Sequence, residues 1–329
     1  MAWAGQFEDS TYRVEMGRWM DDVPARTKSP VMTKSQALDE LRRARLELEF
    51  ATEGLDSFAP VLRALRRIEM WLARPPRIAL IGEFNSGKST LANYLVGIDS
   101  LPTSVVSNTC IPTLLSYASE PTITAVYADG RRELLSAVEA ADGAALTRLE
   151  VGLPSDRLRR LQVLDLPGLD DPSMTGVPYE LSIHHPDALL WCTVATQAWK
   201  ESERAAWLDM PGYLRDRGLL VATFRDLLSD PADQLRVLDR LNGDAAPLFR
   251  EVVMVSAKSA LAALPVSPVT ALSAGSHEEP NGAVDRLVAY TEGKRVAAAL
   301  ALVGRLAKHT LKRMDREPVA ANPRLGNLD

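Results

Sequence analysis

The 329-residue sequence lacks the features that would place it outside a reducing compartment or across a membrane. It has two cysteines, Cys110 and Cys192, which are not spaced like metal ligands, and so few thiols are typical of a reducing compartment. No run of about 18 uncharged apolar residues is present, so no membrane-spanning helix is expected. Glu8 and Asp9 stand where a secretory signal would need an apolar core. We therefore expect a protein that is cytoplasmic or peripheral at the membrane.

The sequence also lacks an excess of positive charge, which limits the partners it can bind. Its formal net charge is -5, and 25% of the residues are charged against 46% that are hydrophobic, an ordinary globular balance. This charge argues against nonspecific binding of nucleic acid, and no appended basic or aromatic RNA-binding module is visible. The length suffices for one large domain or two smaller ones. We expect no nucleic-acid partner.

Apolar runs separated by helical patterns predict an α/β domain with a mainly parallel sheet flanked by helices. The first run is Arg77–Ile81, and a hairpin with a turn at Asp129-Gly130 is predicted further on. Four later runs are "LQVLDLPG", "DALLWCTVAT", "GLLVATFRD" and "EVVMVSAKS". Ligands bind such sheets beyond the carboxyl ends of the strands, so polar residues at these ends are candidates for a site.

Helical patterns flank this domain and predict a helical bundle from both ends of the chain. Helices are expected at 34–55 and 58–73, and Val296, Leu300 and Val303 with Ala307 form the apolar stripe of a last helix at 283–313. The predicted organisation is a partly ordered tail at 1–33, N-terminal helices at 34–75, the α/β domain at 76–261, a linker at 262–282, and a C-terminal helix and tail at 283–329.

The stretch "GEFNSGKST", Gly82 to Thr90, lies between an apolar strand and a helix and predicts a phosphate-binding loop. Gly82 and Gly87 let the backbone turn its N–H groups towards phosphate oxygens, and the following helix adds its dipole. Lys88 can reach the β- and γ-phosphates, and the Ser89 hydroxyl can ligate Mg²⁺. The alternative, a chance match in a glycine-rich turn, does not explain the strand–loop–helix context.

The stretch "VLDLPG" adds an acid and a glycine at the end of another apolar strand. Asp165 can hold Mg²⁺ through water, and the Gly168 N–H can face a γ-phosphate and register its loss. A turn of this composition without a ligand is the alternative. The order of the two motifs along the chain favours the nucleotide site.

Two further strand ends predict where a guanine base binds. GTPases place [Asn/Thr]-Lys-x-Asp at the point where this chain has Thr223-Phe224-Arg225-Asp226. The Asp226 carboxylate can accept two hydrogen bonds from guanine, and adenine cannot supply that donor pair. Phe224 replaces the lysine and can cover the base only by stacking, so we expect guanine selectivity with altered affinity. Asp226 as a simple helix cap is the alternative. "SAK" (256–258) follows one more strand, where a backbone N–H can meet the guanine O6.

The segments "GEFNSGKSTLANYLVG", "LPTSVVSNTCIPTLLSY", "YADGRREL" and "LDLPGLDD" together resemble the dynamin-like GTPases, especially the bacterial ones, over residues 76–260. The resemblance implies that Thr109 is the switch threonine that ligates Mg²⁺, with Thr103 and Thr113 as nearby alternatives. It also implies that Asn85 stabilises charge that develops between the β- and γ-phosphates. The flanking helices are similar to the neck bundle of that family.

On this basis the site residues are assigned as follows. The catalytic set is Lys88, Asn85, Thr109 and Gly168; the metal set is Ser89, Thr109 and Asp165; the nucleotide set is Gly82, Asn85, Ser86, Gly87, Lys88, Ser89, Thr90, Thr223, Asp226, Ser256, Ala257 and Lys258. We expect His184 and His185 to be surface residues without a catalytic role, and Trp191 and Trp199 to pack in the core or an interface.

The resemblance implies a GTPase that hydrolyses GTP to GDP with Mg²⁺ and is activated by dimerisation across the nucleotide face. No residue of "PGLDDPS" offers the catalytic glutamine of small signalling GTPases, so we expect slow turnover that rises with protein concentration. Few residues lie outside the core for a stalk and a lipid-binding tip, so the expected action is on a membrane or a larger dynamin-like partner. Two alternatives stay open: a nucleotide-gated scaffold with little hydrolysis, and a ribosome- or RNA-associated assembly GTPase.

Overall fold

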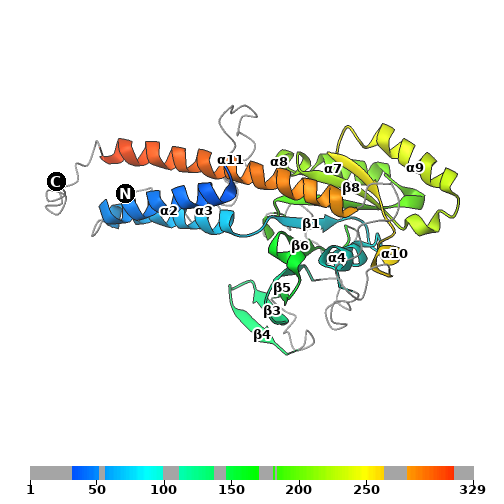
Figure 1. The fold of residues 1–329 in the computed structure, drawn as a ribbon, viewed down its shortest axis with the longest axis horizontal. Coiled ribbons are helices and arrows are strands. Elements are labelled where there is room, and N and C mark those ends of the chain that lie inside the picture. The colour runs from blue at the N-terminus through cyan, green and yellow to red at the C-terminus, as the bar shows by residue number, and fades with distance from the viewer. Residues whose placement is uncertain are drawn as a thin grey trace. The chain divides into compact units, whose positions relative to one another are not determined.

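The computed structural model describes residues 32–51, 56–98, 111–136, 146–169, 181, 184–262 and 280–314. The chain divides into two compact units. One unit is Pro75–Thr291 and holds the sheet, and the other combines Met1–Arg74 with Glu292–Asp329 (Figure 1).

The larger unit is built on a sheet that has nine strands within the described residues, in the order β4-β3-β5-β2-β6-β1-β7-β8-β9. The strands are β1 (Arg77–Ile81), β2 (Thr113–Tyr117), β3 (Thr122–Tyr127), β4 (Arg132–Leu135), β5 (Leu146–Leu153), β6 (Gln162–Asp165), β7 (Ala188–Val194), β8 (Gly218–Thr223) and β9 (Glu251–Met254). Strands β6, β1, β7, β8 and β9 run parallel, whereas β2 is antiparallel to β6. The predicted α/β fold with a mainly parallel sheet is confirmed.

The sheet also contains two strands that sequence analysis did not predict, β2 and β5. They pair in parallel, and β5 is antiparallel to β3 of the predicted hairpin. In β5, Leu149, Val151 and Leu153 are buried at a spacing of two, but Gly152 is buried as well, so the alternation expected of a strand is incomplete. In β2 the buried residues stand together, and this pattern does not separate a short strand from a loop.

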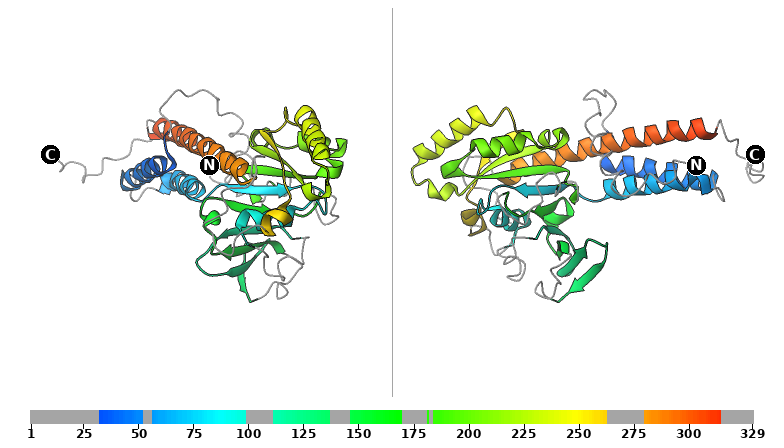
Figure 2. Two further views of the ribbon diagram at one scale, coloured as in Figure 1. Left: turned by 45° about the vertical axis from the view of Figure 1, so that its right-hand side comes forward. Right: turned by 180° about the vertical axis from the view of Figure 1, so that it is seen from behind.

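Helices cover both faces of this sheet (Figures 1 and 2). They are α4 (Lys88–Val96), α7 (Glu201–Leu208), α8 (Gly212–Arg215), α9 (Pro231–Asp244), α10 (Ala257–Ala262) and the first part of α11 (Pro280–Met314). Short 3₁₀ turns are η1 (Asp56–Phe58), η4 (Asp156–Arg159), η5 (Ala195–Gln197) and η6 (Arg225–Leu227).

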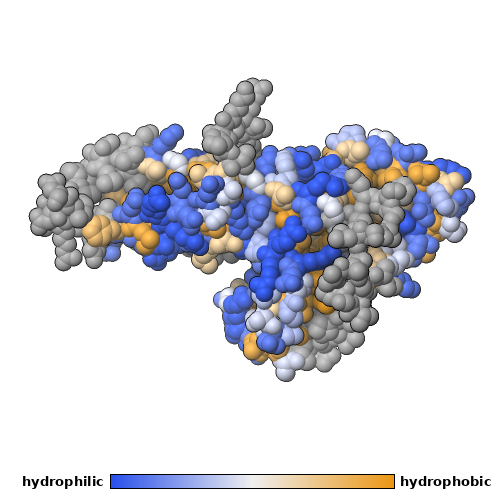
Figure 3. Space-filling view, viewed as in Figure 1, coloured by the Kyte–Doolittle hydropathy of each residue, from blue (hydrophilic) through white to orange (hydrophobic). Residues whose placement is uncertain are grey.

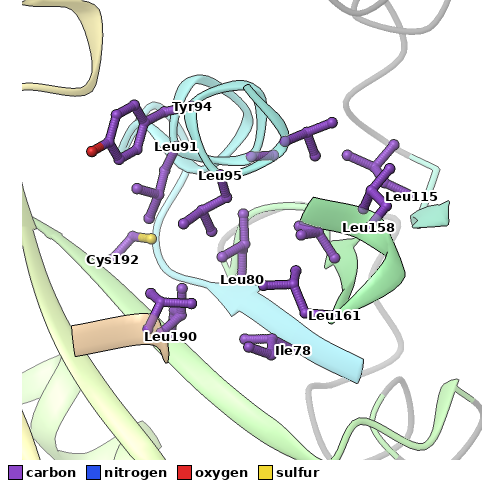
Figure 4. Packing of buried hydrophobic residues seen from close by; sticks show 14 of the residues in the cluster. Ile78, Leu80, Leu91, Tyr94, Leu95, Leu115, Leu158, Leu161, Leu190 and Cys192 are labelled. Atoms are coloured by element: carbon purple, nitrogen blue, oxygen red, sulfur yellow. The ribbon is translucent and has the colours of Figure 1, made fainter. Parts of the chain in front are cut away.

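One face of the sheet packs against α4. Leu91 and Leu95 of the helix point towards Leu80 and Leu190 of the central strands (Figure 4). All four side chains are at most 1% exposed. Their burial fixes α4, and with it the loop that precedes α4, over the carboxyl end of β1.

The opposite face of the sheet carries an aromatic cluster. Trp191 makes edge contacts with Trp199 and Trp207, with ring centroids 6.3 and 5.8 Å apart, and Trp207 stacks on Phe249 at 4.1 Å. These rings are buried, which confirms the expected core role of Trp191 and Trp199. The expectation that both histidines lie at the surface is wrong for His184, which is fully buried because the chain there enters the buried strand β7.

The smaller unit packs α2 (Lys34–Ala51) and α3 (Ala59–Ala73) with the later part of α11 (Figures 1 and 2). Its core is formed by Ala37, Leu41, Leu65, Ile68, Leu72, Val296, Ala299 and Leu302. The predicted stripe on the last helix is therefore wrong at two positions, because Leu300 is 39% exposed and Ala307 is also exposed. The residues of α11 that pack against α2 and α3 are instead spaced by three: Val296, Ala299 and Leu302. Among the described residues, none of the helices combines the length and the apolarity needed to cross a bilayer.

Candidate functional site

The loop between β1 and α4 has backbone geometry that only glycine satisfies at two positions. At Gly82, with φ +156°, a Cβ atom would lie 2.2 Å from the carbonyl oxygen of Cys192. At Gly87, with φ +82°, it would lie 3.2 Å from the ring of Phe224. Asn85 also has positive φ, +58°, and its side chain is exposed. The loop is thus curled tightly against β7 and the end of β8.

Lys88, the first residue of α4, is held inside this curl. Its ammonium group donates to the carbonyl oxygens of Gly82 at 3.0 Å and Glu83 at 2.7 Å, and the residue is 8% exposed. The buried hydroxyl of Ser86 has no hydrogen-bond partner among the described residues. A buried cation beside an unsatisfied hydroxyl and the N-terminus of a helix is suited to an anion, because all three favour negatively charged oxygen atoms.

Ser89 and Asp165 meet beside the loop, from the second residue of α4 and the end of β6. The Ser89 hydroxyl donates to Asp165 Oδ2 at 2.6 Å, and Asp165 Oδ1 is buried without a partner among the described residues. Burial raises the pKa of Asp165, and the Ser89 hydrogen bond and the Lys88 charge offset only part of that effect. A buried carboxylate oxygen without a partner fits a hard cation.

The two oxygen donors do not form a complete cage for a metal ion. No group of three or more His, Cys, Asp and Glu side chains could hold a metal among the residues described here. This fits Mg²⁺, which is usually held by one or two protein oxygens and completes its shell with water and phosphate. The residues present therefore fit a magnesium ion that arrives with a nucleotide.

The structure describes only some of the predicted switch residues. The Leu169 N–H donates to the Gly82 carbonyl at 3.1 Å, which places Gly168 beside the loop. Thr109 and Thr103 lie outside the described residues. The alternative Thr113 starts β2 opposite Asp165, and its hydroxyl donates to the Ile111 carbonyl at 3.2 Å.

The predicted base-binding residues follow β8, on the other side of the loop. The Thr223 hydroxyl donates to the Ser86 carbonyl at 2.7 Å and lies 3.0 Å from the Thr193 carbonyl. Phe224 adopts a left-handed backbone, with φ +57°, and its ring lies against Gly87. Asp226 is exposed in η6, and the cap of α9 is Asp230, whose side chain accepts from the Ala232 N–H at 2.8 Å. The helix-cap alternative therefore has no support at Asp226.

The stretch 256–258, which follows β9, lies next to the predicted base-binding residues that follow β8. The Arg225 N–H donates to the Val255 carbonyl at 3.1 Å, which joins the loop after β8 to the end of β9. Ser256 caps α10, because its hydroxyl accepts from the Ser259 N–H at 3.2 Å. Ala257 and Lys258 then begin the helix, so their N–H groups lie among the unpaired donors of its first turn.

One ion pair of the loop between β1 and α4 was not predicted from the sequence. Lys200 follows the aromatic residue Trp199 and places its ammonium group 2.7 Å from the Glu83 carboxylate. The buried Glu203 carboxylate fixes this turn by accepting from the Lys200 N–H and the Thr193 hydroxyl, both at 2.9 Å. Residues 83 and 200 lie 117 positions apart, and no local pattern marks them as partners.

Comparison with known proteins shows which family shares this domain. Residues 78–223 match the model of the dynamin family. The chain is 29% identical over 243 residues to Dynamin-like protein 2 of Campylobacter jejuni subsp. jejuni serotype O:23/36 (strain 81-176), a match that covers 69% of this chain and 39% of that protein. It is 38% identical over 113 residues to Isoniazid-induced protein IniC of Mycobacterium tuberculosis (strain ATCC 25618 / H37Rv), which covers 32% of this chain and 23% of that protein.

Solved structures of bacterial dynamins share the fold. Two structures of an oligomerised bacterial dynamin pair, described as a mechanism for long-range sensing and tethering of membranes, superpose with TM-scores of 0.51 and 0.50. Their sequence identities are 18% and 19%. The match covers 79% and 92% of this chain but 46% and 59% of those chains, so the chain spans less than two thirds of these relatives.

Proposed function

We propose that the protein binds GTP with Mg²⁺ and hydrolyses it to GDP and phosphate, because residues 78–223 match the model of the dynamin family. The observation that carries this proposal is the meeting of Lys88, Ser89 and Asp165 at the carboxyl ends of β1 and β6. The loops after β8 and β9 lie next to them. This arrangement supports phosphate, metal and base functions at the carboxyl ends of these strands.

The residues at the phosphate end act mainly through charge and position. Lys88 exchanges its two loop carbonyls for β- and γ-phosphate oxygens, and Ser89 with Asp165 holds Mg²⁺. When bound, the metal ion neutralises charge on the phosphates. The Gly168 N–H and Thr109 close on the γ-phosphate, and the exposed Asn85 amide faces the charge that develops between the β- and γ-phosphates.

The residues at the base end select guanine. The Asp226 carboxylate is exposed and accepts from the two donors on the guanine edge, which adenine does not offer. Phe224 already lies against Gly87 and covers one face of the base by stacking. The N–H groups at the start of α10 then donate to the guanine O6. Adenine nucleotides therefore bind more weakly.

A second copy of the chain completes the site by covering the nucleotide face. Apolar surface on that face supports this: Phe84 in the loop is 51% exposed and Leu227, next to Asp226, is 60% exposed. Dimerisation then orders the switches and positions water, which raises turnover. The membrane tethering described for the bacterial dynamin pair supports an action on a membrane or a larger dynamin-like partner.

The test is GTP hydrolysis per molecule as a function of protein concentration, with ATP as comparison and Lys88→Ala as control. Turnover that rises with concentration, prefers GTP and requires Lys88 supports the proposal. A constant, near-zero turnover despite tight GTP binding would exclude self-activated hydrolysis. Phe224 in place of the usual lysine favours the second candidate, a nucleotide-gated scaffold, and single-turnover hydrolysis separates the two.

A further inference from the structure

A cavity of about 500 Å³ lies between α9 and β9, on the side of β8 away from the phosphate loop. Its size is in the usual range for ligand sites, and its lining is largely apolar. Its lining includes Arg225, Leu235, Leu238, Arg250, Val252 and Met254. We call this cavity the α9–β9 groove.

The floor of the groove includes an edge strand. β9 pairs with β8 on one side, and no described strand pairs with its other side. In a parallel strand, alternate N–H and C=O groups point away from the neighbouring strand. As far as the described residues go, β9 therefore offers unpaired backbone donors and acceptors along the groove, the arrangement that accepts an added strand.

The wall of the groove carries leucines that the described part of the chain leaves at least partly exposed. α9 is anchored through the fully buried Leu241. Leu235 is 51% exposed, and Leu238 is only partly buried one turn further along the helix. Apolar residues gather at the surface where Figure 1 places α9 (Figure 3). Apolar side chains beside an open strand edge favour an occupant with apolar side chains of its own.

The two ends of the groove are positively charged. Arg250 directly precedes β9, and the Arg225 N–H donates to the carbonyl of Val255 directly after β9, so one arginine stands at each end. Neither guanidinium forms a salt bridge within the described part of the chain; that of Arg250 lies over the Tyr290 ring, 3.4 Å from its centroid. The acid at the groove, Glu251, is already held by Arg286.

From these observations we propose that the α9–β9 groove binds an extended peptide segment of a partner protein. The segment adds a strand to β9, packs apolar side chains at alternate positions on Leu235, Leu238 and Met254, and places acidic residues against Arg225 and Arg250. β9 spans four residues, and together with Arg250 and Val255 it matches an added strand of about six or seven residues. This function is independent of the GTPase proposal.

The test uses the full chain and a fluorescein-labelled peptide, Glu-Val-Ser-Val-Thr-Val-Glu, followed by fluorescence anisotropy. Comparison peptides carry lysine at both ends, or proline at the central valine to block strand pairing. The key variants are Arg250→Glu and Leu235→Asp. Arg43→Glu is the matched charge control, since Arg43 is exposed on α2, and Leu46→Asp is the matched apolar control at 56% exposure.

We expect saturable binding of the acidic peptide that weakens roughly fivefold or more in Arg250→Glu and in Leu235→Asp, and stays unchanged in the two controls. The lysine and proline peptides should bind the unaltered protein at least as weakly as the acidic peptide binds the two groove variants. Equal binding of all three peptides, or equal binding to all variants with unchanged melting temperatures, would overturn the proposal. So would self-association of the chain that Leu235→Asp abolishes and the peptide does not displace, because the occupant would then be a second copy.

Discussion

Glu83 places a carboxylate inside a loop that we propose binds triphosphate, and Lys200 neutralises it. The two groups are 2.7 Å apart, and the side chain of Lys200 is 39% exposed and that of Glu83 33%. Replacement of Lys200 by methionine keeps most of the apolar stem and removes the charge. It leaves the Glu203 carboxylate with its N–H partner at position 200, so the turn itself should be preserved.

The magnitude follows from two charge effects. A partly exposed ion pair contributes up to about 1 kcal/mol. An uncompensated carboxylate near the phosphates costs a similar amount, roughly 1 kcal/mol at the dielectric of a partly exposed site. The ion pair is present with and without nucleotide, so the first effect lowers stability, and the second alone predicts a loss of GTP affinity of roughly fivefold. Because Glu83 repels ground-state and transition-state phosphates alike, KM should rise while kcat changes little.

The assay is steady-state GTP hydrolysis with KM and kcat determined separately, supported by direct nucleotide binding. Lys200→Arg should keep the wild-type KM, and Glu83→Gln in the Lys200→Met background should restore it, because no charge then needs compensation. A double variant as weak as Lys200→Met alone would refute the charge argument and leave Lys200 with a purely structural role at the start of α7.

Three further predictions follow from the same structure. Burial raises the pKa of Asp165, so Asp165→Asn should raise the melting temperature without nucleotide and remove the stabilisation by Mg²⁺ with GTP; a lower melting temperature of the nucleotide-free variant would contradict this. Phe224→Ala should weaken GTP and GDP binding equally, by about 1 kcal/mol or more, and to the same extent at low and high salt, since a stacked ring carries no charge; a salt-dependent loss in calorimetry would count against stacking. Burial raises the pKa of Glu69, but the hydrogen bonds and charges of Arg42 and Arg45 outweigh it and hold that pKa below the usual 4.5. The stabilisation from Glu69 is therefore present above pH 4.5 and lost as pH falls through the lower folded-state pKa, so Glu69→Gln should destabilise at pH 7 but not in strong acid; equal differences in urea melts at both pH values would disprove it.

The parts of the fold predictable from sequence are those set by local pattern. The strand Arg77–Ile81 has the predicted bounds because it is a short apolar run closed by Pro76 and Gly82. The hairpin turn at Gly130 is marked by its Asp-Gly pair, and the glycine takes positive φ as such turns require. In contrast, β2 and β5 are defined by pairing with strands far along the chain, so their sequences alone do not separate them from loops.

The candidate site divides in the same way, and the division explains which of its residues sequence reasoning can find. Lys88, Ser89 and Asp165 sit at the ends of regular elements, so their order along the chain nearly fixes where they meet. The partners Glu83 and Lys200 meet only because the turn at position 200 is held by the buried Glu203. In the proposed site, such contacts tune the charge of the loop between β1 and α4 without altering its motif. Proteins with the same motif can therefore differ in nucleotide affinity through residues that no motif contains, and the Lys200 variants measure how large that difference is.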